Sequence, residues 1–369
     1  MSDLYLGLMS GTSLDGVDGV LADFASSAPR VLAHASVCFS PHLKAELLAL
    51  NTPADNELHR AALAGNGLMK VYAQVVGQVL ASAATKPEGV QAIGAHGQTV
   101  RHRPQEFDGT GYTLQLCQPA LLAELTGIDV VADFRSRDVA AGGQGAPLAP
   151  FFHQAFFARR GESVGVLNIG GISNLTLLRP DGAVLGFDCG PGNSLMDAWC
   201  DRHTGQPYDA DGAWAAGGRP VPALLQALLS EPYFDRLPPK STGRDLFNPA
   251  WLQARLQAFG ATAAADVQAT LAELTAHSCS ADVERHEPGL RRLIVCGGGA
   301  LNTHLMRRLQ ALLPQVQVAS SAESGLPPLQ VEATAFAWLA RKAVRCEKLA
   351  LESTTGARGA RVLGAIYPA

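Results

Sequence analysis

The sequence lacks the features that would indicate a membrane protein, a nucleic-acid-binding protein or a zinc protein. No apolar run in its 369 residues is long enough to cross a bilayer, and no signal-peptide pattern is visible. There is no long block of Lys or Arg, and the formal net charge is −4, so nucleic acid and anionic membranes are poor partners. The seven cysteines show neither CxxC spacing nor a Cys/His ligand set. We therefore expect free thiols in a reducing cytoplasm and no zinc site.

The composition that is present, 47% hydrophobic and 17% charged residues, is typical of a well-packed globular protein. The length allows about two domains. Strand-like runs alternate with helix-like runs, which predicts an α/β fold. Glycine-rich turns follow several of the strands. The clearest candidate boundary lies at Gly127, where a helix over 119–127 ends and a strand over 128–134 begins.

The first glycine-rich turn lies in "MSGTSLDGVDGVL", residues 9–21, between two predicted strands. Glycine lets a ligand approach the backbone closely, and successive N–H groups in such a turn bind anions such as phosphate. Ser10, Thr12 and Ser13 add hydroxyl donors for phosphate. The carboxylates of Asp15 and Asp18 could hold Mg²⁺ through its waters. By itself, the segment is equally compatible with a simple tight hairpin.

Two later turns strengthen the phosphate interpretation. Gly170 and Gly171 follow an apolar strand in "VLNIGG", and Gly297, Gly298 and Gly299 lie between a strand and a helix in "LIVCGGGALN". "LMSGTS" and "LNIGGIS" are alike, which suggests two related halves. The P-loop pattern is absent, and the Rossmann spacing fails at the third turn. Three such turns predict one nucleotide held on several sides.

This ordered set of turns resembles the sugar-kinase, Hsp70 and actin superfamily. The resemblance implies an α/β fold of two RNase H-like domains with an ATP cleft between them. We expect residues 1–126, completed by 346–369, to form the first domain, with the first phosphate hairpin. Residues 127–345 would form the second domain. The common DxGxT form is not matched, because Ser10 stands near the place of that Asp.

Longer stretches narrow the resemblance. "GLMSGTSLDGVD", "AIGAHGQTVRH", "DVAAGGQGAPL", "NIGGISNL" and "GFDCGPGN" together resemble anhydro-N-acetylmuramic acid kinases. That family phosphorylates 1,6-anhydro-N-acetylmuramic acid with ATP, and water opens the anhydro bridge, during bacterial cell-wall recycling. The resemblance implies ATP and Mg²⁺, a cytoplasmic location and a homodimer. The nucleotide-binding residues it implies are Gly11, Thr12, Ser13, Leu14, Asp15, Gly16, Val17, Asp18, Gly170, Gly171, Gly297, Gly298 and Gly299, with Asp15 or Asp18 near the metal.

Because O6 of this sugar lies in an ether bridge, the reaction needs a base that activates water. Asp188, at the end of an apolar strand before glycines, is the candidate base. A turn or helix-cap role for Asp188 is equally compatible with the local sequence. His96, Glu332 and either Arg135 or Arg137 are the candidate sugar-binding residues, the arginine for the lactyl carboxylate.

The motif "STGRDLFN" at 241–248 has no role that we can assign from sequence. Another sugar or carboxylate kinase, acting on a free hydroxyl, is the alternative function.

Overall fold

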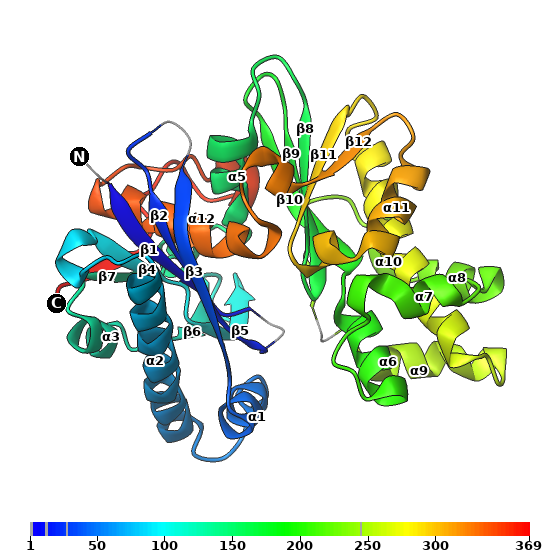
Figure 1. The fold of residues 1–369 in the computed structure, drawn as a ribbon, viewed down its shortest axis with the longest axis horizontal. Coiled ribbons are helices and arrows are strands. Elements are labelled where there is room, and N and C mark those ends of the chain that lie inside the picture. Colours follow the sequence, from blue (N-terminus) through cyan, green and yellow to red (C-terminus); the bar gives the residue numbers. More distant parts are fainter. Residues whose placement is uncertain (1–2, 12–13, 27–28, 244–245) are drawn as a thin grey trace. The chain divides into compact units, whose positions relative to one another are not determined.

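The structure is a computed structural model that describes residues 3–11, 14–26, 29–243 and 246–369. The chain divides into two compact units: unit 1 contains residues 1–152 and 330–369, and unit 2 contains residues 153–329. Each unit is built on one mixed β-sheet with helices against it (Figure 1). None of the helices in the described ranges is long and apolar enough to span a bilayer.

The sheet of unit 1 has six strands in the described residues, in the order β13-β7-β4-β1-β2-β3. Strands β1, β2 and β3 form an antiparallel meander. Strand β4 pairs in parallel with β1, β7 pairs in parallel with β4, and β13 pairs antiparallel with β7 at the edge. The bounds are β1 (Leu4–Met9), β2 (Gly16–Asp23), β3 (Arg30–Cys38), β4 (Ala92–Ala95), β7 (Val130–Ala132) and β13 (Ala365–Tyr367). A separate hairpin consists of β5 (Gln98–Pro104) and β6 (Gly111–Leu116).

Two long helices, α2 (Glu57–Ser82) and α12 (Val331–Val344), cover opposite faces of this sheet. Gly7 on β1 is paired with Gly94 on β4. A Cβ added to either glycine would collide with the α12 backbone, at Ala333 O or Phe336 O respectively. These glycines therefore let the helix lie directly on the two strands. On the other face, Gly19 adjoins Val75 of α2. The shorter helices are α1 (Pro41–Ala49), α3 (Pro119–Thr126), α4 (Ser136–Ala140) and α13 (Glu352–Thr355), and α5 (Ala149–Phe157) leads into unit 2.

The sheet of unit 2 has the order β10-β9-β8-β11-β12. It repeats the plan of unit 1: three antiparallel strands in a meander, then two parallel strands. The strands are β8 (Val164–Ile169), β9 (Ile172–Leu178), β10 (Val184–Pro191), β11 (Arg292–Cys296) and β12 (Gln317–Ser320). The helices are α6 (Ser194–Thr204), α7 (Ala213–Gly217), α8 (Pro222–Leu229), α9 (Pro249–Leu256), α10 (Ala264–His286) and α11 (Thr303–Leu312).

The shared plan of the two sheets confirms the predicted α/β fold with two related halves. The first hairpin, β1–β2, and the second, β8–β9, occupy equivalent places in their sheets. The domain boundaries lie elsewhere than the sequence led us to expect. Residues 127–152 belong to unit 1 because β7 pairs with β4 in the first sheet, and residues 330–345 belong there because α12 packs on β1 and β4.

Candidate functional site

The first glycine-rich turn lies between the end of β1 at Met9 and the start of β2 at Gly16. Thr12 and Ser13, two of its predicted ligand-binding residues, lie outside the described residues. The carbonyl oxygen of Gly11 accepts hydrogen bonds from Leu14 N, at 3.2 Å, and from Gln98 Nε2, at 3.2 Å. Leu14 and Val17 are buried in the core of unit 1. These two residues therefore anchor the turn by packing, and a ligand would meet them through their main chain.

A buried hydrogen-bond network joins the base of this turn to Gly97, which follows β4, and to Tyr72 of α2. The Ser10 hydroxyl donates to the Gly97 carbonyl at 2.9 Å and lies 2.9 Å from the Tyr72 hydroxyl. The Gly97 N–H donates to the same Tyr72 oxygen at 3.1 Å. Burial raises the pKa of Tyr72, so this phenol stays protonated. Tyr72 is a single tyrosine on a long helix, so no local sequence signal marks it as part of this network.

The two carboxylates proposed for Mg²⁺ have separate protein partners. Asp15 is exposed and pairs with Lys44 Nζ of α1 at 3.3 Å. Asp18 lies on β2 and accepts a hydrogen bond from Ser36 of β3. Across the described part of the chain, no three His, Cys, Asp or Glu side chains gather in a way that could hold a metal ion. These residues do not fit a direct metal site.

The structure brings the predicted sugar-binding residues of unit 1 together around Arg135. Arg135 Nη2 lies 2.9 Å from His96 Nε2, and its Nη1 donates to the Gly145 carbonyl at 2.8 Å. Glu332, at the start of α12, interacts electrostatically with Arg135 and raises its pKa against the larger effect of burial, which lowers that pKa to about 10. Arg135 is therefore the arginine that faces inward, and Arg137 is exposed.

His96 is held as a neutral imidazole. Burial, and then the charge of Arg135, lower the pKa of His96 to about 3. Because Arg135 must donate to Nε2, the ring proton is assigned to Nδ1, which faces the Ser10 carbonyl at 3.3 Å. His96 thus links the first glycine-rich turn to Arg135.

The loop around Gly145 is fixed by a buried carboxylate. Asp138 accepts hydrogen bonds from Gly145 N and from Thr355 Oγ1, both at 2.6 Å. Burial raises the pKa of Asp138, and these two bonds oppose that rise. The loop that presents the Gly145 carbonyl to Arg135 is therefore tied to the C-terminal segment of the chain.

In unit 2, the second hairpin is hydrogen-bonded to the residues that follow β10. The carbonyls of Gly170 and Gly171 accept hydrogen bonds from Asn193 N, at 2.8 Å, and Gly192 N, at 3.0 Å. A Cβ added at Gly170 or Gly171 would meet no protein atom closer than 3.7 Å. The fold does not itself exclude a side chain at either position, so protein packing does not explain these two glycines.

In the third turn, the backbone conformation and close protein contacts explain why Gly297 and Gly299 are glycines. Gly297 has φ +76°, and a Cβ there would collide with Asn168. A Cβ on Gly299 would collide with Ile169, at the end of β8. The predicted strand-turn-helix differs in one respect: a short 3₁₀ turn, Gly298–Leu301, separates the strand from α11. The helix N-terminus is capped by the Asn302 side chain, which accepts from Leu305 N.

Asp188 lies on β10, beside a bulge between Asp188 and Gly190. In register it faces Asn174 of β9, three residues after Gly171, which is about 10 Å along the strand. One carboxylate oxygen accepts from Thr242 N at 3.0 Å. Burial raises the pKa of Asp188 to about 6, opposed by that hydrogen bond and by the charge of Lys240. A partly desolvated carboxylate with such a pKa is a suitable general base near neutral pH.

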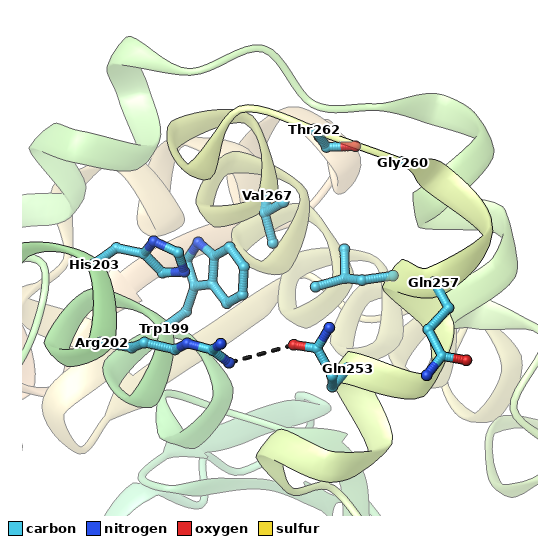
Figure 2. A pocket seen from close by; sticks show the side chains of 9 residues that line it. Trp199, Arg202, His203, Gln253, Gln257, Gly260, Thr262 and Val267 are labelled. Atoms are coloured by element: carbon cyan, nitrogen blue, oxygen red, sulfur yellow. Dashed lines mark hydrogen bonds between the residues drawn. The ribbon is translucent and has the colours of Figure 1, made fainter.

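Unit 2 also contains a cavity of about 290 Å³ among α6, α9 and α10 (Figure 2). Trp199 and His203 form one wall, and Arg202 donates to Gln253 across it at 3.3 Å. None of its lining residues is among the predicted site residues. The cavity is therefore a separate feature of the helical part of unit 2.

Comparison with known proteins decides the family. The sequence pattern of the anhydro-N-acetylmuramic acid kinases matches residues 3–369. The chain belongs to the anhydro-N-acetylmuramic acid kinase family. A family member from Variovorax paradoxus is 66% identical over 372 residues, covering all of this chain and 99% of the relative. Another, from Albidiferax ferrireducens, is 62% identical over 389 residues with both chains fully covered.

Among solved structures, the activator of 2-hydroxyisocaproyl-CoA dehydratase from Clostridium difficile with bound ADPNP is 13% identical. It aligns with a TM-score of 0.49 over 94% of this chain and 96% of that protein. Membership of the anhydro-N-acetylmuramic acid kinase family confirms the resemblance inferred from the quoted motifs.

Proposed function

We propose that this chain phosphorylates 1,6-anhydro-N-acetylmuramic acid with ATP and opens the anhydro bridge with water. The products are N-acetylmuramic acid 6-phosphate and ADP. The observation that carries the proposal is the place of Asp188, a carboxylate whose pKa is raised to about 6. Its register partner Asn174 lies about 10 Å along β9 from the Gly170–Gly171 hairpin. Membership of the kinase family supports the same reaction.

The chemistry follows from the bonds of the substrate. The Asp188 carboxylate takes one proton from water, and the oxygen of that water attacks C1 of the sugar. The C1–O6 bond breaks, and O6 attacks the γ-phosphorus of ATP as ADP leaves. Asp188 then releases its proton to solvent, so the sum is sugar, water and ATP giving the 6-phosphate, ADP and one proton. A general base in this role contributes about 10²–10⁴-fold in rate.

We assign the nucleotide to the glycine turns and the sugar to the Arg135 cluster. The main chain at Gly11–Val17, at Gly170–Gly171 and at Gly297–Gly299 would bind the phosphates and the adenosine. Arg135 would pair with the lactyl carboxylate, because a guanidinium offers paired donors to a carboxylate. Glu332 would contact sugar hydroxyls. His96, whose ring nitrogens face Arg135 and the Ser10 carbonyl, would support sugar binding by holding Arg135. Mg²⁺ is proposed as the counter-ion that ATP brings with it. A cytoplasmic homodimer is the expected state.

Running the reaction in ¹⁸O-labelled water tests the mechanism directly. Label should appear on the anomeric oxygen of the product and not in the phosphate, because O6 of the sugar becomes the ester oxygen. Products must be read promptly by mass spectrometry, since a free anomeric centre exchanges with solvent.

The open sugar, N-acetylmuramic acid, is the matched comparison in an ADP-release assay. If the open sugar reacts better than the anhydro sugar, or if label enters the phosphate, an ordinary kinase acting on a free hydroxyl replaces this proposal.

A further inference from the structure

The unassigned motif at 241–248 is preceded by a buried lysine. The side chain of Lys240 is 1% exposed, and its Nζ lies 3.1 Å and 3.0 Å from the two carboxylate oxygens of Asp282. Asp282 lies on α10 and its side chain is 4% exposed. Lys240 Nζ also lies 5.4 Å from the ring centre of Phe187 and 5.3 Å from that of Tyr233. This is a complete ion pair inside the core of unit 2.

A buried ion pair needs an explanation, because desolvation makes it no more stabilising than apolar side chains of the same size. The neighbours of Lys240 suggest the reason. Phe187 directly precedes Asp188 on β10, and the Tyr233 hydroxyl donates to the Asp188 carbonyl at 2.8 Å. The ion pair therefore lies beside the main chain of the proposed base.

The segment 240–242 holds Asp188 at two points. The N–H of Asp188 donates to the Lys240 carbonyl at 3.2 Å, which attaches the segment to β10. The N–H of Thr242 donates to Asp188 Oδ2 at 3.0 Å, which restrains that carboxylate oxygen. Lys240 is the residue that ties this segment to α10, through Asp282.

We propose that Lys240 is a positioning residue for Asp188: held by Asp282, it fixes segment 240–242 so that the Thr242 N–H orients the carboxylate toward water. The inference rests on the proposed function in taking Asp188 as the base. It gives the residues at the start of the 241–248 motif a role. Lys240 itself touches neither the sugar nor ATP in this assignment.

Lys240 also affects the pKa of Asp188 through its charge. Lys240 and the Thr242 hydrogen bond both lower the pKa of Asp188 against the larger effect of burial. The other titratable groups around the pair are Cys189 on β10, Tyr233 from the turn Pro232–Asp235, and Cys279 and His286 on α10. Removing the ion pair should therefore raise the pKa of Asp188.

The test is a carboxyl titration of Asp188 by NMR, with ¹³C-labelled aspartate and Asp188→Asn to assign the signal. In the wild-type protein, the Asp188 signal should titrate near pH 6, and the amide proton of Thr242 should follow the same midpoint. In the double variant Lys240→Met/Asp282→Leu, the midpoint should rise, because the charge that lowers the pKa of Asp188 is gone. In this variant the kcat should fall while the KM for ATP stays unchanged.

A matched control is Arg308→Met/Glu273→Leu, which removes another ion pair of α10. It should leave both the Asp188 midpoint and kcat unchanged. A folded Lys240/Asp282 variant with an unchanged midpoint overturns the inference. A wild-type Thr242 amide that ignores the titration of Asp188 overturns it too, without any variant. If the titrations behave as expected but the anhydro sugar is not turned over, the proposed function fails and the positioning of Asp188 stands.

Discussion

Arg135 Nη2 and His96 Nε2 lie 2.9 Å apart, and the guanidinium can only donate, so the imidazole must accept. This pairing requires His96 to be neutral, in agreement with its pKa of about 3. His96 is therefore not an acid or base at physiological pH. It aligns Arg135, whose other terminal nitrogen is held by the Gly145 carbonyl.

Replacing Arg135 by Lys should weaken sugar binding. A lysine cannot keep the bonds to His96 and Gly145 and also offer paired donors to a carboxylate. We expect the KM for the anhydro sugar to rise about tenfold to hundredfold, with ATP affinity unchanged. Arg137→Lys, on the exposed neighbour, is the control and should behave as wild type. An anhydro sugar without the lactyl group should lose little in the Arg135 variant; an equal loss for both sugars would remove the carboxylate from this assignment.

Asp188→Asn should reduce kcat by about 10²–10⁴-fold, because an amide cannot take a proton from water. ATP should still bind, as measured by calorimetry, since the glycine turns are unchanged. In the wild-type enzyme, kcat/KM should fall as the pH drops through about 6, where Asp188 becomes protonated. His96 and His102 have pKa values lowered to about 3 and about 4, so their titration should not contribute to the fall of kcat/KM near pH 6. Near-normal turnover in Asp188→Asn would exclude this residue as the base.

The same substitution should stabilise the protein at neutral pH. The folded pKa of Asp188, about 6, lies above its ordinary value, so between about pH 4 and 6 the folded state binds more protons than the unfolded state. Stability from this group is therefore present at low pH and lost as the pH rises through 6. Asp188→Asn removes that loss, and we expect a gain of about 2 kcal/mol in urea unfolding at pH 7.5. At pH 4 the two proteins should be equally stable.

Gly170→Val should weaken nucleotide binding without unfolding unit 2. The nearest protein atom to an added Cβ is Ile172 O at 3.7 Å, so the variant fits the fold. A branched side chain there would occupy the space that a phosphate needs. Gly289→Val, an exposed position with no atom within 4 Å of an added Cβ, is the control. Calorimetry with ADP and thermal melts separate the two effects. Unchanged ADP affinity in folded Gly170→Val would remove this hairpin from the nucleotide site.

The sequence predicted the parts of the fold whose signals are local. The hairpin strands, the glycine turns and α6 all follow from apolar runs bounded by glycine or by a helix start. Asp188 and Arg135 were found because unusual short motifs surround them. The roles predicted for them came from the resemblance of those motifs to a family, since the local residues alone left a structural role open.

What the sequence did not reveal depends on contacts between distant residues. Helix α10 has buried polar residues, among them Thr275, whose hydroxyl donates to the carbonyls of Pro191 and Gly192. Such a helix shows no clear apolar stripe. Lys240 and Asp282 are 42 residues apart, and only the fold pairs them. The observed domain boundary differs from the predicted one for the same reason, because the sequence of a short strand such as β7 does not indicate which sheet it joins.

The two segments of unit 1 set an order of assembly. Residues 330–369 supply α12, which lies on Gly7 and Gly94, and β13, which pairs with β7. During synthesis from the N-terminus, all of unit 2 is made before these residues exist. Unit 2 therefore has every strand of its sheet while unit 1 still lacks one covering helix. A chain cut short after residue 329 would carry a complete second unit beside a bare apolar sheet face, the kind of surface that chaperones and proteases recognise.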